Sequence, residues 1–290
     1  RSKKNVLKVP HVAWPTLGLA GALLTTWICS TVAAAEGVIS MPLAVVINTL
    51  AAYASFTPMH DAAHQSVARF RWVNETIGRM SGIVLAASFP AFRLMHLTHH
   101  QHTNDCENDP DMWAGRGPAL LLPLRWLTQD LVYYSIYYRV WNERPVLERI
   151  ELVTCVAGSI VLAAMAVQAG YGMEVLCLWL IPARLATGML AFAFDYLPHR
   201  PHLVTSKENR FLASHIIRGR WLTGPMLGQN YHLVHHLYPG VPWYRYGAVW
   251  AARKEILMAQ GARFVPLFGS VEESMPPAVI TAEAPIKWSA

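Results

Sequence analysis

Charged residues and thiols are both scarce in this chain of 290 residues. Asp, Glu, Lys and Arg make up 14% of the sequence, against about 25% in an ordinary soluble domain, and 53% is hydrophobic. The four cysteines, Cys29, Cys106, Cys155 and Cys177, show no CxxC spacing, which argues against a disulfide framework or a zinc ribbon. The basic residues that give a net charge of +6 are dispersed. We therefore expect them to face membrane lipids, with no nucleic acid as partner.

Long apolar runs take the place of the missing charge. Four runs of about 20 residues are long enough to cross a bilayer, at residues 12–35, 38–58, 150–170 and 173–194. The first run is too long for the core of a signal peptide. The links "AAEGVIS" and "QAGYGME" are short and join the runs into two hairpins. We expect an all-α polytopic membrane protein that forms a single domain over residues 1–290.

The basic residues also predict an orientation. Neither link contains Lys or Arg, so both links should lie outside, and both termini should face the cytoplasm. A cytoplasmic cap would then comprise residues 59–148 and 195–275. Two weaker apolar stretches in the cap's first part, 77–95 and 118–138, are interrupted by proline and charge and predict re-entrant or interfacial helices. Arg184, in the middle of the fourth run, is expected to pair with a carboxylate or carbonyls; a functional role is the alternative.

Histidine is concentrated where the apolar runs end. The motif "HDAAH" follows the second run, "HLTHH" lies at residues 96–100, "DYLPHRPH" follows the fourth run, and "HLVHH" lies at 232–236. Histidines at positions i and i+4 share one face of a helix, whereas the adjacent histidine of each triplet points about 100° away. Nine or ten converging imidazoles exceed what one metal ion binds, so the pattern predicts two metals.

The donor set narrows the choice of metal. Many imidazoles with few carboxylates suit iron, zinc, copper or nickel, and not calcium or magnesium. A structural zinc site usually contains thiolates, and no cysteine is suitably placed. We therefore expect a redox pair of iron ions at the membrane surface. A histidine-rich transporter or metal sensor is the alternative from another class, but it predicts polar residues along the spans.

These motifs resemble the integral-membrane fatty acid desaturase and hydroxylase superfamily over about residues 40–255. The stretches "HLTHHQHTNDCENDPDMW", "FDYLPHRPH" and "LGQNYHLVHHLYPGVPWYRY" are similar to the β-carotene hydroxylases of the cyanobacterial and plant type. The related β-carotene ketolases share a stretch like "YLPHRP", but their third histidine box differs and their second lacks "NDxENDPD". The resemblance therefore favours hydroxylation, with a ketolase or a fatty acid desaturase as the alternatives.

The resemblance implies a ligand set. The metal ligands would be His60, His64, His96, His99, His100, His199, His232, His235 and His236. Asp195 stands where several relatives have Asn, so its carboxylate would bind or bridge the metals and act as a catalytic residue. His102 and His202 are expected to surround the site without binding metal. Asp61, Asp105, Asp109, Asp111 and Asn230 are candidates to orient the ligands.

The resemblance also implies a reaction. Two non-haem iron ions would use O₂ to hydroxylate the β-ionone rings of β-carotene, towards zeaxanthin. The substrate is a lipid-soluble carotenoid and would enter from the bilayer. Electrons would come from an external carrier, and the basic cytoplasmic face would attract an acidic one such as a ferredoxin.

Overall fold

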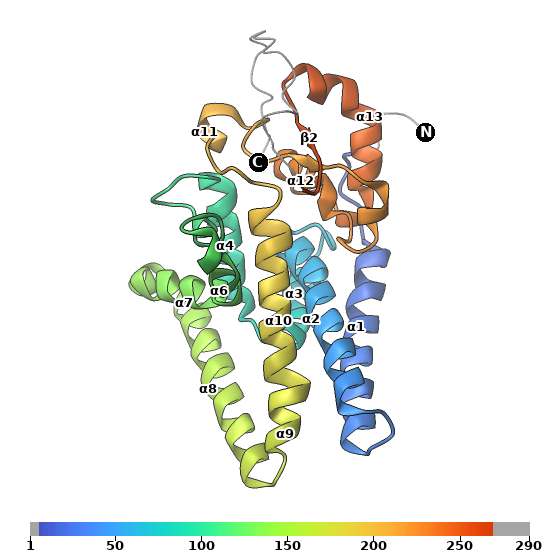
Figure 1. Cartoon of the computed structure of the whole chain (residues 1–290), viewed down its shortest axis with the longest axis vertical. Coiled ribbons are helices and arrows are strands. Elements are labelled where there is room, and N and C mark those ends of the chain that lie inside the picture. The colour runs from blue at the N-terminus through green and yellow to red at the C-terminus, as the bar shows by residue number, and fades with distance from the viewer. Residues whose placement is uncertain (1–5, 269–290) are drawn as a thin grey trace.

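The computed structural model describes residues 6–268, which are almost entirely helical (Figure 1). The last residues of the expected cap, 269–275, lie outside this range. The main helices are α1 (Trp14–Ala35), α2 (Met41–Ala63), α3 (Arg71–Leu85), α4 (Phe89–His102), α5 (Met112–Gly115), α6 (Leu122–Leu127), α7 (Gln129–Arg139), α8 (Val146–Gln168), α9 (Gly172–Val175), α10 (Ile181–Leu190), α11 (Ser206–Asn209), α12 (His232–Leu237) and α13 (Tyr246–Ala259). Strands β1 (Ile216–Ile217) and β2 (Phe264–Val265) pair in parallel.

Shorter helical turns complete the chain. Two of them are π-helical, η4 (Leu176–Leu180) and η5 (Ala191–Tyr196), and they continue the line of α9 and α10. The 3₁₀ turns are η2 (Ala119–Leu121), η3 (Trp141–Glu143), η6 (Arg220–Thr223), η7 (Gln229–Tyr231) and η8 (Trp243–Arg245). The fourth span is therefore a composite helix from Gly172 to Tyr196.

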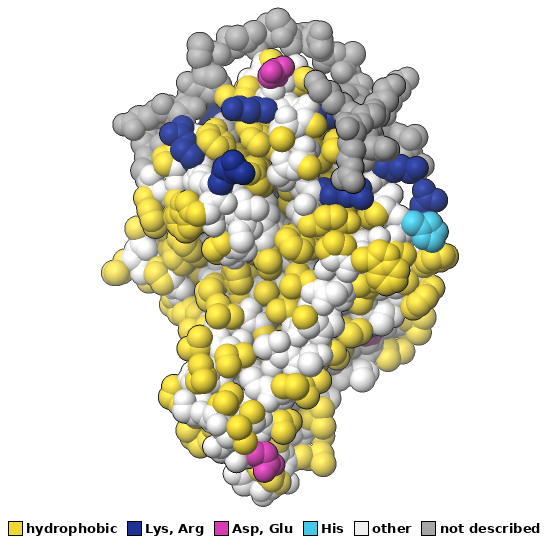
Figure 2. Space-filling model, turned by 90° about the vertical axis from the view of Figure 1, so that its right-hand side faces the viewer, with side chains coloured by type: hydrophobic (Ala, Val, Ile, Leu, Met, Phe, Trp, Pro, Cys, Tyr) yellow, Lys and Arg dark blue, Asp and Glu magenta, His cyan; other side chains and the backbone are white. Residues whose placement is uncertain are grey.

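The two predicted hairpins are confirmed. Helices α1, α2, α8 and the composite helix that contains α10 are each long and apolar enough to cross a membrane. The hairpins extend to one end of the molecule, and α4, α11, α12 and α13 lie at the other (Figure 1). On the face drawn in Figure 2, Lys and Arg gather toward the cap end above a wide hydrophobic area. The prediction of an all-α protein with four spanning helices therefore holds.

Helix α2 is the centre of the bundle. More than half of its spanning window is buried, 56%, against 6% for α8, whose apolar side chains face outward. The buried amide of Asn48 donates to the carbonyl of Leu178 (2.8 Å) and to the hydroxyl of Thr31 (3.0 Å). A buried amide satisfied in this way costs little and links three spans. Helix α2 is thereby fixed between its neighbours.

The stretch 77–95, which was expected to be re-entrant or interfacial, lies in a sharply bent pair of helices, as a re-entrant segment would. Helices α3 and α4 meet at 101°, because Ala86 adopts a left-handed conformation (φ 57°) and ends α3. The amide of Ala87 donates to the carbonyl of Gly82 (2.8 Å) and closes the elbow. Pro90 lies in the first turn of α4, where proline is tolerated, and so does not cause the break.

Arg184 takes the structural role that was expected of it. Its guanidinium donates to both carboxylate oxygens of Asp130 (2.5 and 3.0 Å) and to the carbonyl of Leu127. Both partners lie in the stretch 118–138, which forms η2, α6 and α7. The pair joins α7 to the fourth span and neutralises the one arginine within that span.

The N-terminal segment packs on the cap. Val6 and Leu7 contact the buried cluster formed by α12 and α13, and Arg245 donates to the carbonyl of Lys8 (2.7 Å). The start of α1 and the histidine-bearing cap therefore lie at the same end of the molecule.

The elbow gives the first testable prediction. A Cβ on Gly82 would lie 2.5 Å from the carbonyl oxygen of Ala87, a backbone atom that cannot rotate away. We expect Gly82→Ala to destabilise the protein by about 1–3 kcal/mol and to lower its melting temperature in detergent by several degrees. Gly18→Ala is the matched control, since a Cβ on Gly18 meets nothing within 4 Å. Equal melting temperatures for the two variants would contradict the proposed packing at the elbow.

Candidate metal centre

The ends of four helical segments bring the histidines together. His60 lies in the last turn of α2, and His64 is the first residue after that helix. Helix α4 carries four histidines in its second half, of which His102 is not predicted to bind metal; α12 carries three more, and His199 follows η5. Since each segment ends or lies at the cap, the membrane-spanning helices position the motifs at a common level.

The first histidine group is His60, His64, His96, His100 and His235. The Nε2 atoms of His60 and His235 are 3.0 Å apart, and those of His64 and His96 are 2.8 Å apart. The Nε2 atom of His100 lies 2.7 Å from that of His235 and 3.2 Å from that of His96. Five ring nitrogens from α2, α4 and α12 thus face one small volume.

The second histidine group is His99, His199, His232 and His236. The Nε2 atom of His236 lies 3.3 Å from that of His99 and 3.0 Å from that of His232. The ring of His199 lies 4.8 Å from the ring of His99 and 4.9 Å from that of His232, centroid to centroid. The nine predicted histidines are those that form the two groups.

Helical phase divides the histidines between the groups. His96 and His100 are one turn apart and join the first group, whereas His99 turns to the second. In α12 the pattern reverses, because His232 and His236 join the second group and His235 the first. Each triplet therefore serves both groups, as the offset of one residue predicted.

Three of the four histidines of the second group have an oxygen partner at Nδ1. The Nδ1 atom of His199 donates to the carbonyl of Ala213 (3.0 Å), and that of His232 donates to Oε1 of Gln229 (3.2 Å). The Nδ1 atom of His99 lies 2.8 Å from Oδ1 of Asp109. A neutral imidazole that donates through Nδ1 presents a lone pair at Nε2. The inward Nε2 atoms of His199 and His232 are therefore acceptors.

This arrangement fits metal ions. Lone pairs about 3 Å apart repel unless a cation lies between them, and the buried Nε2 of His199 has no hydrogen-bond partner among the described residues. Two imidazole nitrogens that bind one metal at about 2.1 Å, with a right angle between the two bonds, lie about 3.0 Å apart. The Nε2–Nε2 distances of 2.7 to 3.3 Å within the two groups match this separation. Neither group contains a cysteine or a carboxylate in the described chain, so the donor set suits iron, zinc or copper.

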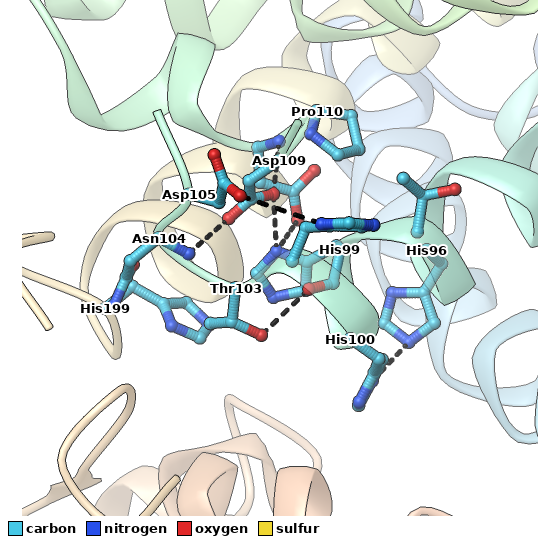
Figure 3. Close-up of polar contacts among 12 residues, drawn as sticks. His96, His99, His100, Thr103, Asn104, Asp105, Asp109, Pro110 and His199 are labelled. Carbon is cyan, nitrogen blue, oxygen red and sulfur yellow. Dashed lines mark hydrogen bonds and ion pairs between the residues drawn. The ribbon is translucent and has the colours of Figure 1, made fainter. Parts of the chain in front are cut away.

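Two aspartates control His99. Burial lowers the pKa of this histidine, but the charges of Asp109 and Asp111 more than offset it and raise the pKa to about 9. Asp109 in turn accepts from the backbone amides of Asn104 (2.7 Å) and Asp111 (2.9 Å), as Figure 3 shows in part. Because these acids contact Nδ1, they orient a ligand. We interpret them as supports for the second group and not as a third metal site.

The remaining second-group histidines are held neutral. Burial lowers the pKa of His199, His232 and His236 well below the usual value, and the neighbouring histidines lower it further. Metal ligation requires this unprotonated form.

Some expected supports lie elsewhere. Oδ1 of Asp61 is 3.9 Å from Nδ1 of His60, too far for a hydrogen bond; Asp61 accepts from Thr16 (2.9 Å) instead. Asp105 lies 3.7 Å from His102, outside both groups. Asn230, a candidate to orient His232, makes no hydrogen bond with it among the described residues, and Gln229 contacts His232 in its place.

Sequence reasoning also missed Tyr246. Its hydroxyl lies 3.1 Å from Nδ1 of His235, and the side chain is fully buried. It lies eleven residues beyond its partner, on α13, so no helical spacing could have pointed to it. Gln229, by contrast, stands three residues before His232, a spacing that places two side chains side by side.

Asp195 belongs to neither histidine group in the described part of the chain. The sequence suggested that it shares a helix face with His199, four residues on. However, Asp195 lies in the π-helical η5, whose wider turn changes the angle between such side chains. Asp195 instead lines a cavity between α2, α4, α7 and the fourth span. Its predicted role as a ligand stays a prediction.

This cavity is mostly apolar; it lies beside the first histidine group and is linked to the second through Tyr133 and Asp111. Phe56 and Phe92 line it, and their rings lie 5.3 Å from the ring of His60 and 5.4 Å from that of His96. Tyr133 also lines it and donates its hydroxyl to Asp111, whose carboxylate lies 3.2 Å from Nδ1 of His99. We call it the apolar cavity.

A hollow on the opposite side reaches the histidines from the cap surface. His100 of the first group and His236 of the second line it, together with Lys207 and Arg210 from the region of α11. Both groups therefore approach the surface at a basic part of the cap.

Known proteins resemble the chain over most of its length. A β-carotene ketolase of Paracoccus sp. strain PC1 is 29% identical over 245 residues, which covers 79% of this chain and 89% of that protein. A second β-carotene ketolase, of Paracoccus sp. strain N81106, is 28% identical over 200 residues, or 66% of this chain and 71% of that one.

Acyl-lipid enzymes are similar as well. An sn-1 oleoyl-lipid 12-desaturase of Anabaena variabilis is 25% identical over 219 residues and covers 70% of this chain, which spans only about half, 52%, of that protein. Residues 37–268, which include both histidine groups and all but the first of the four spans, match the fatty acid desaturase family. The chain belongs to the fatty acid desaturase family of membrane proteins.

Proposed function

We propose that the protein is a membrane di-iron oxygenase that hydroxylates the β-ionone rings of β-carotene. One atom of O₂ enters a ring C–H bond and the other leaves as water, with two electrons from an external carrier and two protons from solvent. The observation that carries the proposal is the pair of histidine groups, in which nine imidazoles gather at two adjacent points with their closest Nε2 atoms about 3 Å apart. Membership of the desaturase family and the similarity to β-carotene ketolases support it.

The first histidine group would hold one iron and the second the other. Bound iron supplies the one-electron chemistry needed to activate O₂. The chain supplies geometry: Asp109, Gln229 and the carbonyl of Ala213 fix the rings of the second group, and Tyr246 fixes His235. Such contacts keep ligands in place while the charge of the metals changes.

The apolar cavity would bind the end of the substrate. The cavity lies where the fourth span meets α4 and α7. The rings of Phe56 and Phe92 form the wall between the cavity and the first group. A cavity of this kind excludes water from the reacting carbon and suits a lipid-soluble ring. The same centre would serve ketone formation or acyl desaturation, as the names of the relatives indicate, so the walls of the cavity decide the outcome.

Electrons would enter at the hollow beside α11. An acidic carrier of the ferredoxin type is complementary to Lys207 and Arg210, and the histidines beneath them offer a short route to both metals. This assignment requires the cap to face the cytoplasm, in agreement with the scarcity of basic residues in the two links.

Removal of single ligands tests the metal assignment. We expect His60→Ala, His99→Ala and His235→Ala to abolish oxygenation and to lower the iron content of detergent-purified protein from about two per chain, because each loss opens a metal position. His102→Ala is the matched control: it lies on α4 beside the ligands but belongs to neither group. Iron content measured by mass spectrometry decides. Normal iron content in the three variants would refute the assignment.

Product analysis tests the reaction. In a host that makes β-carotene, the wild-type protein should yield hydroxylated rings on chromatography with mass detection, and the His235→Ala protein should not. Ring ketones would establish the ketolase alternative, and new double bonds in membrane lipids with unchanged carotenoids would establish a desaturase.

Orientation is tested with inserted tags. We expect epitope tags placed after Gly37 and before Gly172 to be reached only from outside the cell, because both links lack basic residues. A tag in the loop 105–108 should be reached only from the cytoplasm. Labelling of the first two tags from the cytoplasmic side alone would overturn the orientation.

A further inference from the structure

Three polar groups on the wall of the apolar cavity have no partner. Ser88 and Gln129 are each only 3% exposed, yet the Oγ of Ser88 and the Oε1 of Gln129 accept and donate no hydrogen bond among the described residues. No hydrogen bond or ion pair in the described chain involves the carboxylate of Asp195, which lines the same cavity. Buried polar groups are normally satisfied, so two such groups beside an unpaired, half-buried carboxylate indicate a bound molecule with polar atoms.

Local structure explains why each of these three polar side chains lacks a hydrogen-bond partner. Ser88 is the N-cap of α4, where a serine hydroxyl usually accepts from the helix, but here it makes no such bond. The amide nitrogen of Gln129 donates to the carbonyl of Pro110 (3.0 Å), which fixes the amide and leaves its oxygen free. Asp195 reaches the cavity from the π-helical turn η5, and such turns are frequent at functional sites.

Most of the rest of the wall is hydrocarbon, and the other polar side chains that line it have hydrogen-bond partners within the protein. Phe56, Met59, Leu85, Phe92 and Leu190 line the cavity around these three residues. A purely hydrocarbon ring would satisfy the walls but would leave a hydroxyl, an amide oxygen and a carboxylate unpaired, which is costly. A ring that carries a hydroxyl group matches both surfaces, because a hydroxyl accepts from Ser88 and donates to Gln129 or Asp195.

We propose that Ser88, Gln129 and Asp195 bind an oxygen atom on the ring that occupies the apolar cavity, so that the protein prefers a hydroxylated carotenoid end group to the bare hydrocarbon. This proposal rests on the proposed function and adds the feature by which the substrate or product is selected. The oxygen is either present on the substrate before the reaction or is the hydroxyl that the reaction installs. Both sources have the same chemistry at these three residues.

Binding without turnover tests the proposal. Full-length protein, as purified and reconstituted in phosphatidylcholine nanodiscs without reductant, is titrated with β-carotene or zeaxanthin, and the quenching of its tryptophan fluorescence is followed. The two molecules share one skeleton, and zeaxanthin adds a hydroxyl to each ring. We expect zeaxanthin to bind about tenfold more tightly, and Ser88→Ala and Gln129→Leu each to remove most of this preference.

Ser81→Ala is the matched control. Ser81 is likewise buried with an unpartnered hydroxyl, but it does not line the cavity, so the preference should persist. Equal binding of the two carotenoids by the wild-type protein, as when water alone satisfies the three groups, overturns the proposal. A preference that survives in both cavity variants overturns it as well. Melting temperatures of all variants identify any that are misfolded.

Turnover distinguishes the two sources of the oxygen. Further oxygenation of zeaxanthin by iron-loaded, reduced protein assigns the oxygen to the substrate. Competitive inhibition of β-carotene turnover by unchanged zeaxanthin assigns it to the product. A protein that shows the binding preference but oxygenates neither carotenoid refutes the proposed function and leaves the oxygen-binding site standing, because binding is measured without reductant.

Discussion

Repulsion between inward-facing lone pairs is the constraint on which the rest of this structure depends. Nine imidazoles face one another with their closest Nε2 atoms about 3 Å apart, and the hydrogen bonds that His199 and His232 donate through Nδ1 leave their Nε2 atoms as lone-pair acceptors. Without cations such an assembly is unfavourable, so helices must hold it. The buried core of α2, the elbow between α3 and α4, and the packing of α12 on α13 supply that rigidity. The packing that determines the fold therefore also determines the positions of the metal-binding histidines.

Sequence alone was sufficient for the parts governed by periodicity. Apolar runs located the four spans, and the phase of an ideal helix separated His99 from His100 and His235 from His236. It was insufficient where the backbone departs from ideal geometry. The left-handed Ala86 sets the bend between α3 and α4 and carries no apolar or proline signal, and the π-helical turn at Asp195 changes the angle between its side chain and that of His199 from the value in an α-helix. Supports distant in sequence, such as Tyr246, carry no local signal at all.

The similarity to both ketolases and acyl-lipid desaturases has a physical basis in the division of this molecule. The histidine groups are built from helix ends at the cap, and nothing in their geometry depends on the shape of a substrate. The apolar cavity is built from α2, α4, α7 and the fourth span, and no histidine of either group is among the described residues that line it. In the proposed function one centre would therefore serve rings or chains, and the cavity would determine which carbon approaches the metals.

Tyr133 is the side chain through which these two parts meet. It lines the cavity, and its hydroxyl donates to Asp111, which lies beside the outer nitrogen of His99. A molecule that displaces Tyr133 would alter the hydrogen bond to Asp111 and with it the electron density that His99 offers to a metal. The opposite wall holds the first group only through ring contacts of Phe56 and Phe92, which transmit position and not charge. The two histidine groups therefore differ in their coupling to the cavity, and the second is the one whose electronic properties can respond to its occupant.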